Sequence, residues 1–136
     1  MSEANKAVVR RFIEEGLNKG DAAVLAEVRS PEIVWHGGVL GEASGVAELR
    51  DHLVAVHDAF PDLQARIEEL LAEGDLVVAR TTVSGTHSGP LFGVAATGIR
   101  TTWTAIAMYR FRDGKIVEQW LNEDWAAALR QVGALP

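Results

Sequence analysis

Apolar residues recur with helical spacing in four parts of the chain. The clearest pattern covers residues 3–18, where one side is apolar and the other carries Lys, Arg and Glu, as in a helix that packs on a core. Shorter patterns predict helices over residues 22–28 and 125–131. A longer pattern predicts a helix over residues 46–59, which Pro61 brings to an end.

The second half of the chain is rich in β-branched and aromatic residues. Residues 76–87 and 101–111 predict two long strands, and residues 115–124 predict a third. A short run over residues 33–36 predicts an earlier strand. The stretch before residue 76 is ambiguous, because its composition favours helix while a two-residue turn follows it. The turn favours pairing, so residues 66–72 are expected to form a hairpin with the next strand.

Helices followed by a run of antiparallel strands describe an α+β domain. We expect a cone-shaped fold in which the N-terminal helices pack on a strongly curved antiparallel sheet and enclose a pocket. The outer face of such a sheet also needs cover, so a homodimer through this face is expected. No linker, repeat or low-complexity tract divides the chain, and residues 1–136 are expected to form a single domain.

Composition excludes several classes of site and partner. The chain has no cysteine, which excludes disulfides, zinc–thiolate sites and cysteine nucleophiles. Its net charge of −6 and its lack of a basic cluster argue against nucleic acid as a partner. No apolar run is long enough for a membrane span or a signal peptide, so a cytoplasmic protein is expected.

The last predicted strand carries the first candidate for chemistry. Regular alternation places its side chains on two faces, with Ile116, Glu118, Trp120, Asn122 and Asp124 on one and Val117, Gln119 and Leu121 on the other. If the first face lines a closed apolar pocket, partial desolvation would suit the Asp124 carboxylate to proton transfer. Asp124 also stands directly before a predicted helix, where Asp is a common N-cap. The two interpretations differ in whether a pocket reaches the carboxylate oxygens.

Motifs spread along the chain carry a resemblance to a known family. They are GDLVVARTTVSGTHSG from Gly74, the residue Trp103, YRFRDGKIVEQW with an Asp four residues after its Trp, the step PEIVW at residues 31–35, and AFPDL at residues 59–63. With them the chain resembles the SnoaL-like polyketide cyclases of the nuclear transport factor 2-like superfamily. The resemblance implies the cone-shaped fold more strongly than one activity, because this fold hosts isomerases, hydrolases, cyclases and noncatalytic modules.

The resemblance also implies a site and a reaction. In the cyclases an Asp on the last strand acts as general acid and base in an intramolecular aldol condensation, without a metal or an organic cofactor. Asp124 is the matching position. The base would remove a proton next to a carbonyl or ester, and the enolate would attack a second carbonyl. The implied partner is a small hydrophobic or polycyclic substrate, such as a polyketide-like carbonyl compound.

Two histidines are candidates to assist Asp124. The family position that matches His87 often faces the cavity, where an imidazole would hydrogen-bond the developing oxyanion; the alternative role of His87 is to anchor the loop that follows. His36, next to Trp35 on the first strand, is the second candidate, and its alternative role is a structural hydrogen bond.

Arg80 is expected to pair with Glu118 or to position an anionic group of the substrate. Because it lies seven residues from His87, the two enter one pocket only if Gly85 marks a bulge. Aromatic residues are expected to form the pocket walls or the core: Trp35, Phe60, Trp103, Tyr109 and Trp120.

Other functions of the same fold stay open. An epoxide hydrolase of the limonene type would need an Arg-x-Asp pair, whereas the chain reads Arg80-Thr81-Thr82. An isomerase like ketosteroid isomerase would need an early acidic base and a Tyr/Asp oxyanion hole, and Tyr109 is the one phenol in the sequence. A noncatalytic small-molecule-binding dimer would use Asp124 only as a helix cap.

Overall fold

The computed structural model describes residues 2–37 and 41–136. Its helices are α1 (Ser2–Arg11), which continues as the π-helical segment η1 (Phe12–Leu17), then α2 (Ala22–Val28), α3 (Val46–Ala59) and α4 (Trp125–Gln131). Its strands are β1 (Arg29–Gly37), β2 (Gly41–Ser44), β3 (Gln64–Glu73), β4 (Leu76–Thr86), β5 (Arg100–Arg112) and β6 (Lys115–Glu123).

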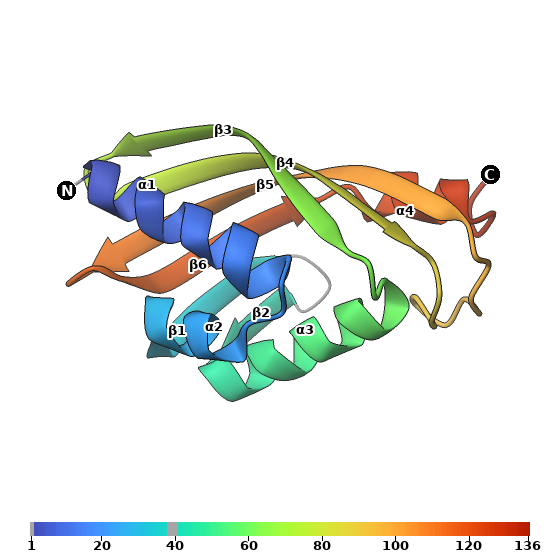
Figure 1. Ribbon diagram of the computed structural model, residues 1–136, viewed down its shortest axis with the longest axis horizontal. Helices are drawn as coiled ribbons and strands as arrows, with labels where there is room; N and C mark the ends of the chain where they lie inside the picture. The colour runs from blue at the N-terminus through green and yellow to red at the C-terminus, as the bar shows by residue number, and fades with distance from the viewer. Residues whose placement is uncertain (1, 38–40) are drawn as a thin grey trace.

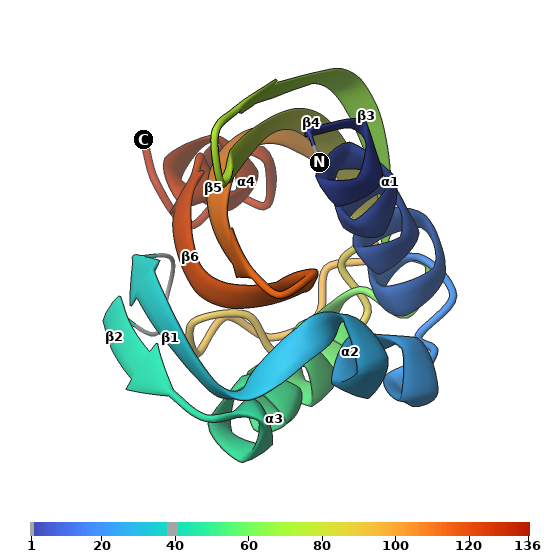
Figure 2. The same ribbon diagram turned by 90° about the vertical axis from the view of Figure 1, so that its left-hand side faces the viewer.

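The strands form one mixed sheet in the order β2-β1-β6-β5-β4-β3 (Figure 1). The sheet curls around one side of the molecule without closing, and α1 crosses its open side (Figure 2). The α+β fold with helices on a curved sheet is therefore confirmed.

The sheet is antiparallel except between β1 and β6, which run parallel. This parallel pair differs from the expected antiparallel sheet. It arises because β1 lies between β2, with which it pairs antiparallel, and the last strand β6.

The helix and hairpin predictions agree with these elements. The ambiguous stretch forms β3, which pairs with β4 across the Gly74-Asp75 turn. The structure adds the short strand β2, where a loop was expected, and β1 begins four residues earlier than the predicted strand. In the core, Val9 and Phe12 of the N-terminal helix pack with inward side chains of the sheet, such as Tyr109.

A β-bulge in β6 decides which of its side chains face inward. β6 advances by two residues, from Ile116 to Glu118, while β5 advances by one, so Val117 is an extra residue. Ile116 is fully buried, but beyond the bulge the buried residue is Gln119, at 3% exposed, and not Glu118. The inward row then ends at Glu123. Alternation counted from Ile116 therefore predicted the wrong inward face for the second half of this strand.

Candidate active site

A cavity of about 90 Å³ lies between the concave face of the sheet and the helices. Most of its wall is apolar, including Phe12, Trp35, Leu53, Val56, Leu63, Ala65, Val83, Ala105, Ala107 and Leu121. The volume is small beside the roughly 300–1,000 Å³ of pockets that enclose drug-sized ligands. A polycyclic molecule would thus place only part of its ring system inside unless side chains move.

The described lining residues with polar side chains come from four strands and α3. They are Arg29, His52, Thr81, Tyr109, Gln119 and Glu123. Such a pocket, apolar with a few polar groups, suits an apolar ligand that is oriented by two or three hydrogen bonds.

Glu123 is the carboxylate of this cavity. Burial raises the pKa of Glu123 to about 7, while a hydrogen bond from Trp103 opposes that rise. The indole Nε1 of Trp103 lies 2.7 Å from Oε2 of Glu123. A carboxyl group with a pKa near neutrality can both accept and return a proton at physiological pH, as general acid–base catalysis requires.

Asp124 lies outside the cavity. Its residue is exposed, and its Oδ1 accepts a 3.0 Å hydrogen bond from the backbone N–H of Ala127. Asp124 is therefore the N-cap of α4, which stabilises the first turn of that helix. Of the two interpretations of this residue, the structure bears out the cap and places the pocket-facing carboxylate one residue earlier.

The two histidines named as assistants are apart from the cavity lining. His36 lies on the outer face, where its ring stacks on Trp120 with centroids 5.2 Å apart and its Nε2 lies 2.7 Å from Oε2 of Glu118. His87 is fully buried, and its Nδ1 lies 2.9 Å from the hydroxyl of Thr97. His87 thus anchors the loop after β4, the alternative that the sequence left open.

Arg80 also lies on the outer face. Its Nε donates a 2.8 Å hydrogen bond to Glu69 on the neighbouring strand β3, and not to Glu118. The β4–β5 register has no bulge at Gly85, so Arg80 and His87 point to opposite faces, as regular alternation requires. The expected pairing of Arg80 with Glu118 is wrong.

Of the five aromatic residues expected in the walls, Trp35 and Tyr109 line the cavity. Trp103 is buried behind it and contacts both Phe60 and Glu123. Phe60 belongs to the core, and Trp120 lies on the outer face beside Arg110. The sequence thus identified aromatic residues of the interior but placed one of them on the wrong face.

Sequence reasoning missed Glu123, Gln119 and Arg29 as cavity residues. Glu123 and Gln119 were missed because the bulge at Val117 exchanges the faces of the residues that follow it, and no glycine marks this bulge in the sequence. Nothing in the local sequence separated Arg29 from a surface residue, since it follows the short helix α2 and precedes Ser30-Pro31.

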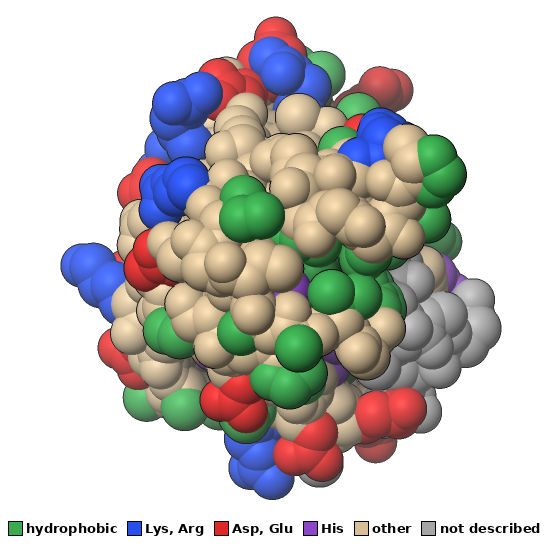
Figure 3. All heavy atoms as spheres, turned by 90° about the vertical axis from the view of Figure 1, so that its right-hand side faces the viewer, with side chains coloured by type: hydrophobic (Ala, Val, Ile, Leu, Met, Phe, Trp, Pro, Cys, Tyr) green, Lys and Arg blue, Asp and Glu red, His purple; other side chains and the backbone are tan. Residues whose placement is uncertain are grey.

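A groove lies beside the cavity at the surface of the protein. The groove lies between α3 and residues of the β4–β5 loop and α4, including Pro90, Phe92 and Trp125. His52 and Val56 line both the groove and the cavity, so these two side chains separate them. Hydrophobic side chains gather on this end of the molecule, with patches of histidine surface between them (Figure 3).

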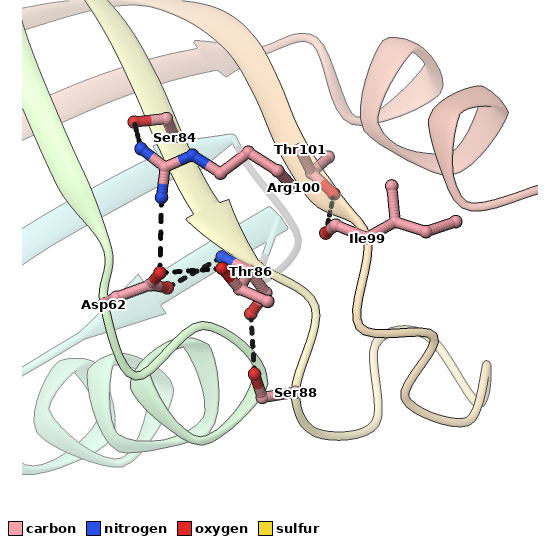
Figure 4. A network of polar contacts seen from close by, with 7 residues as sticks. All are labelled: Asp62, Ser84, Thr86, Ser88, Ile99, Arg100 and Thr101. Carbon is pink, nitrogen blue, oxygen red and sulfur yellow. Dashed lines mark hydrogen bonds and ion pairs between the residues drawn. The ribbon is translucent and has the colours of Figure 1, made fainter.

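A polar network holds the ends of the β4–β5 loop (Figure 4). The backbone N–H and the hydroxyl of Thr86 donate to Asp62 over 2.7 and 2.8 Å, and Arg100 donates to the same carboxylate over 3.2 Å. The hydrogen bonds from Thr86, with help from Arg100, hold the pKa of Asp62 below its usual value. The loop that borders the groove is therefore fixed at its base to the segment after α3.

Within residues 2–37 and 41–136, no group of three or more His, Asp or Glu side chains is placed to hold a metal ion. The same part of the chain contains no helix that is long and apolar enough to cross a membrane.

The fold and the cavity define a class of small α+β proteins in which a curved sheet and its helices surround a pocket with one enclosed carboxylate. A family description, SnoaL-like polyketide cyclase, matches residues 7–132, and the chain belongs to this family. It is 33% identical over 130 residues to the aklanonic acid methyl ester cyclase AcmA of Streptomyces galilaeus. The matched region covers 93% of this chain and 89% of AcmA.

Solved structures of the family superpose over nearly the whole chain. AclR of Streptomyces galilaeus, described as a candidate hydroxylase, is 32% identical with a TM-score of 0.90 and full coverage of both chains. IdmH of Streptomyces antibioticus, described as a candidate polyketide cyclase, is 30% identical with a TM-score of 0.83 over 95% of this chain and 98% of that one.

Proposed function

We propose that this protein is a cyclase that performs cofactor-independent acid–base chemistry on a polyketide-like carbonyl substrate, with Glu123 as the acid and base. The observation that carries the proposal is the Glu123 carboxyl group, which faces an apolar cavity and has a pKa of about 7. A family in which relatives are polyketide cyclases supports the substrate class.

The proposed reaction is an intramolecular aldol condensation. The Glu123 carboxylate removes a proton from a carbon next to a carbonyl or ester, and the electron pair of that C–H bond forms an enolate. The enolate carbon attacks a second carbonyl of the same molecule, which forms a carbon–carbon bond and an alkoxide. The protonated Glu123 then returns its proton to the alkoxide oxygen. General acid–base catalysis contributes about 10²–10⁴ in rate, and holding the chain in a folded pose contributes further.

Glu123 is preferred to Asp124 for a geometric reason. A general base must come within hydrogen-bond reach of the proton that it removes. The Glu123 side chain lines the cavity, whereas the Asp124 carboxylate is exposed and accepts the N–H of Ala127. Asp124 remains the position that matches the family's catalytic residue, so the two neighbouring carboxylates must be compared directly.

The test is turnover by the wild type, Glu123→Gln and Asp124→Asn. Aklanonic acid methyl ester is a first candidate substrate because a relative is named for it, and ring closure is followed by chromatography with mass detection. Glu123→Gln should lose at least about a hundredfold in kcat, in keeping with loss of the acid–base group. Asp124→Asn keeps a capping side chain and should stay within a few-fold of wild type. The reverse pattern would assign the role to Asp124 and overturn the proposal.

Two other classes of function make different predictions. An isomerase or an epoxide hydrolase would convert other substrates with the same dependence on Glu123. A noncatalytic ligand-binding module would bind apolar carbonyl compounds, seen as a rise in melting temperature, without converting them. Product analysis on a panel of bound ligands separates these outcomes.

The outer face of the sheet supports the further proposal of a homodimer. Leu71, Val78, Met108 and Trp120 lie in register across β3, β4, β5 and β6 on this face. Ile106 nearby is 52% exposed. An apolar row of this kind is a common site of self-association. Sedimentation of the wild type should give twice the monomer mass, and Met108→Lys should shift it to the monomer; a monomeric wild type would remove the proposal.

A further inference from the structure

Arg29 places an unpaired positive charge in the cavity. It is the first residue of β1 and is 2% exposed, and it lines the cavity wall. Its Nε and Nη1 are buried and have no hydrogen-bond partner among the described residues. Because an arginine side chain stays protonated in proteins and a buried charge needs a partner, this arrangement is costly without a ligand.

The ring contact that Arg29 makes leaves its Nε and Nη1 without hydrogen-bond partners among the described residues. Its guanidinium carbon lies 5.4 Å from the centre of the Phe12 ring, a distance at which the ring face attracts a cation. A ring face offers no oxygen acceptor, so this contact leaves the two buried donors without a hydrogen bond. Burial lowers the pKa of Arg29 to about 10, so the group is still charged at neutral pH.

Two more polar groups line the cavity with Arg29. Tyr109 on β5 and Gln119 on β6 are directly opposite each other in the sheet, and both are buried, at 3% exposed each. The Oε1 of Gln119 has no partner among the described residues. A guanidinium and a phenol that can donate hydrogen bonds therefore line the cavity beside an amide oxygen that can accept one.

The backbone of Arg29 lies toward the other end of β6 from Glu123, with Tyr109 and Gln119 between the two. Arg29 is in register with Ile116, seven residues before Glu123, which corresponds to roughly 23 Å of backbone along the strand. The two charged groups therefore enter the cavity from different ends, and Arg29 does not contribute to the perturbation of Glu123. Different parts of one ligand can occupy the two ends.

We propose that Arg29, together with Tyr109, binds an anionic oxygen of the ligand, namely a carboxylate or an ionised phenol or enol. This inference rests on the proposed function, because it assigns the orientation of the substrate in the same cavity: the acidic oxygen lies against Arg29 and the reacting carbon lies toward Glu123. Ligands with an acidic oxygen at one end are the preferred substrate class. A guanidinium recognises such oxygens with two N–H groups at once.

The test uses single-ring probes that suit the small cavity. Benzoate is compared with benzamide, its neutral analogue, by isothermal titration calorimetry. The wild type should bind benzoate at least about tenfold more tightly than benzamide. Arg29→Met should abolish this preference, and Arg29→Lys should keep part of it. Arg110→Met is the matched control, since Arg110 lies over Trp120 on the outer face, and it should leave the preference unchanged.

A second arm distinguishes an ionised phenol from a carboxylate. 4-Nitrophenol changes its absorbance when it ionises, and binding beside Arg29 should lower its pKa in the wild type but not in Arg29→Met. An effect on nitrophenol without a preference for benzoate would assign the site to phenolates, and the reverse would assign it to carboxylates. The proposal would be overturned if the wild type bound benzoate no more tightly than benzamide and ionised 4-nitrophenol no more tightly than its neutral form.

The outcome does not depend on the identity of the base. Glu123→Gln should retain the preference for the anionic probe, even if turnover shows that Glu123 has no catalytic role. If Arg29→Met does not fold, Tyr109→Phe provides the same comparison, and it should weaken benzoate binding more than benzamide binding. An equal loss of affinity for benzoate and for benzamide would contradict the assignment.

Discussion

The indole nitrogen of Trp103 donates a 2.7 Å hydrogen bond to Oε2 of Glu123 across the β5–β6 pair. Ala105 is the residue directly opposite Glu123, so Trp103 is its diagonal neighbour on the same face. The hydrogen bond favours the charged carboxylate and burial favours the neutral acid. The balance between the two determines at which pH Glu123 changes from acid to base.

Removal of the Trp103 donor should shift this balance. Trp103→Phe keeps an aromatic ring but loses the indole N–H, so the pKa of Glu123 should rise above its wild-type value. The titration of the Glu123 side-chain carboxyl carbon, followed by ¹³C NMR, measures the shift. Trp120→Phe on the outer face is the control and should leave the titration unchanged. A lower pKa in Trp103→Phe would contradict the stated role of the hydrogen bond.

The raised pKa of Glu123 predicts how stability varies with pH. The folded protein holds this proton up to about pH 7, whereas the unfolded chain releases it near its ordinary value of 4.5. Between these values the folded state binds more protons, so its contribution to stability is full below the lower value and falls as pH rises, by at most roughly 3 kcal/mol.

Glu123→Gln tests this because glutamine stays neutral at every pH. The variant should be more stable than wild type by up to roughly 2–3 kcal/mol at about pH 8 and equal to it at about pH 4. Urea unfolding across this range gives the difference. A constant difference would show that folding does not raise the pKa of Glu123, and a difference that changes in the opposite direction toward acid would show that folding lowers it.

Asp124 and Glu123 are neighbours with separate roles, and stability can tell them apart. Asp124→Ala removes the side chain that accepts the N–H of Ala127, and it should lower the free energy of unfolding by about 1 kcal/mol. Asp124→Asn retains the cap and should lower the free energy of unfolding by less. Thermal unfolding of both variants checks this, and equal losses would mean that the cap contributes little.

Asp62 should make the protein sensitive to acid. Its pKa is held low mainly by the hydrogen bonds from Thr86, so its contribution to stability is present above the unfolded pKa and is lost as pH falls through the folded value. Asp62→Asn should therefore have a lower free energy of unfolding than wild type at neutral pH. This difference should become smaller in acid. Asp51→Asn, at an exposed position on α3, is the control and should show a smaller gap.

The fold could be predicted further than the site. Helical spacing and the two hairpin turns were sufficient to identify the helices and β3 to β6, because both signals are local. The strand β2 and the parallel pairing of β1 with β6 could not be predicted, since β2 has four residues and parallel pairing joins segments far apart in the sequence. The interior position of Arg29 was also inaccessible, because its burial depends on elements from both ends of the chain.

The carboxylate predicted at the end of β6 and the carboxylate that lines the cavity belong to neighbouring residues, and the difference between them has a physical reason. Side chains on a strand alternate, so an error of one position exchanges a cavity group for a solvent group. The sequence identified a carboxylate at the end of β6, but the structure places Glu123 inside and Asp124 at the helix cap.

The extra residue at Val117 has a consequence for comparisons among relatives of this protein. A relative without the bulge would have a β6 shorter by one residue, and an alignment must then place a gap in this strand. If the gap is placed after Val117 instead of at Val117, cavity residues of one protein are aligned with outer-face residues of the other. Superposition of backbones, rather than alignment of letters, is therefore the sound basis for transferring a catalytic assignment from one cyclase of this family to another.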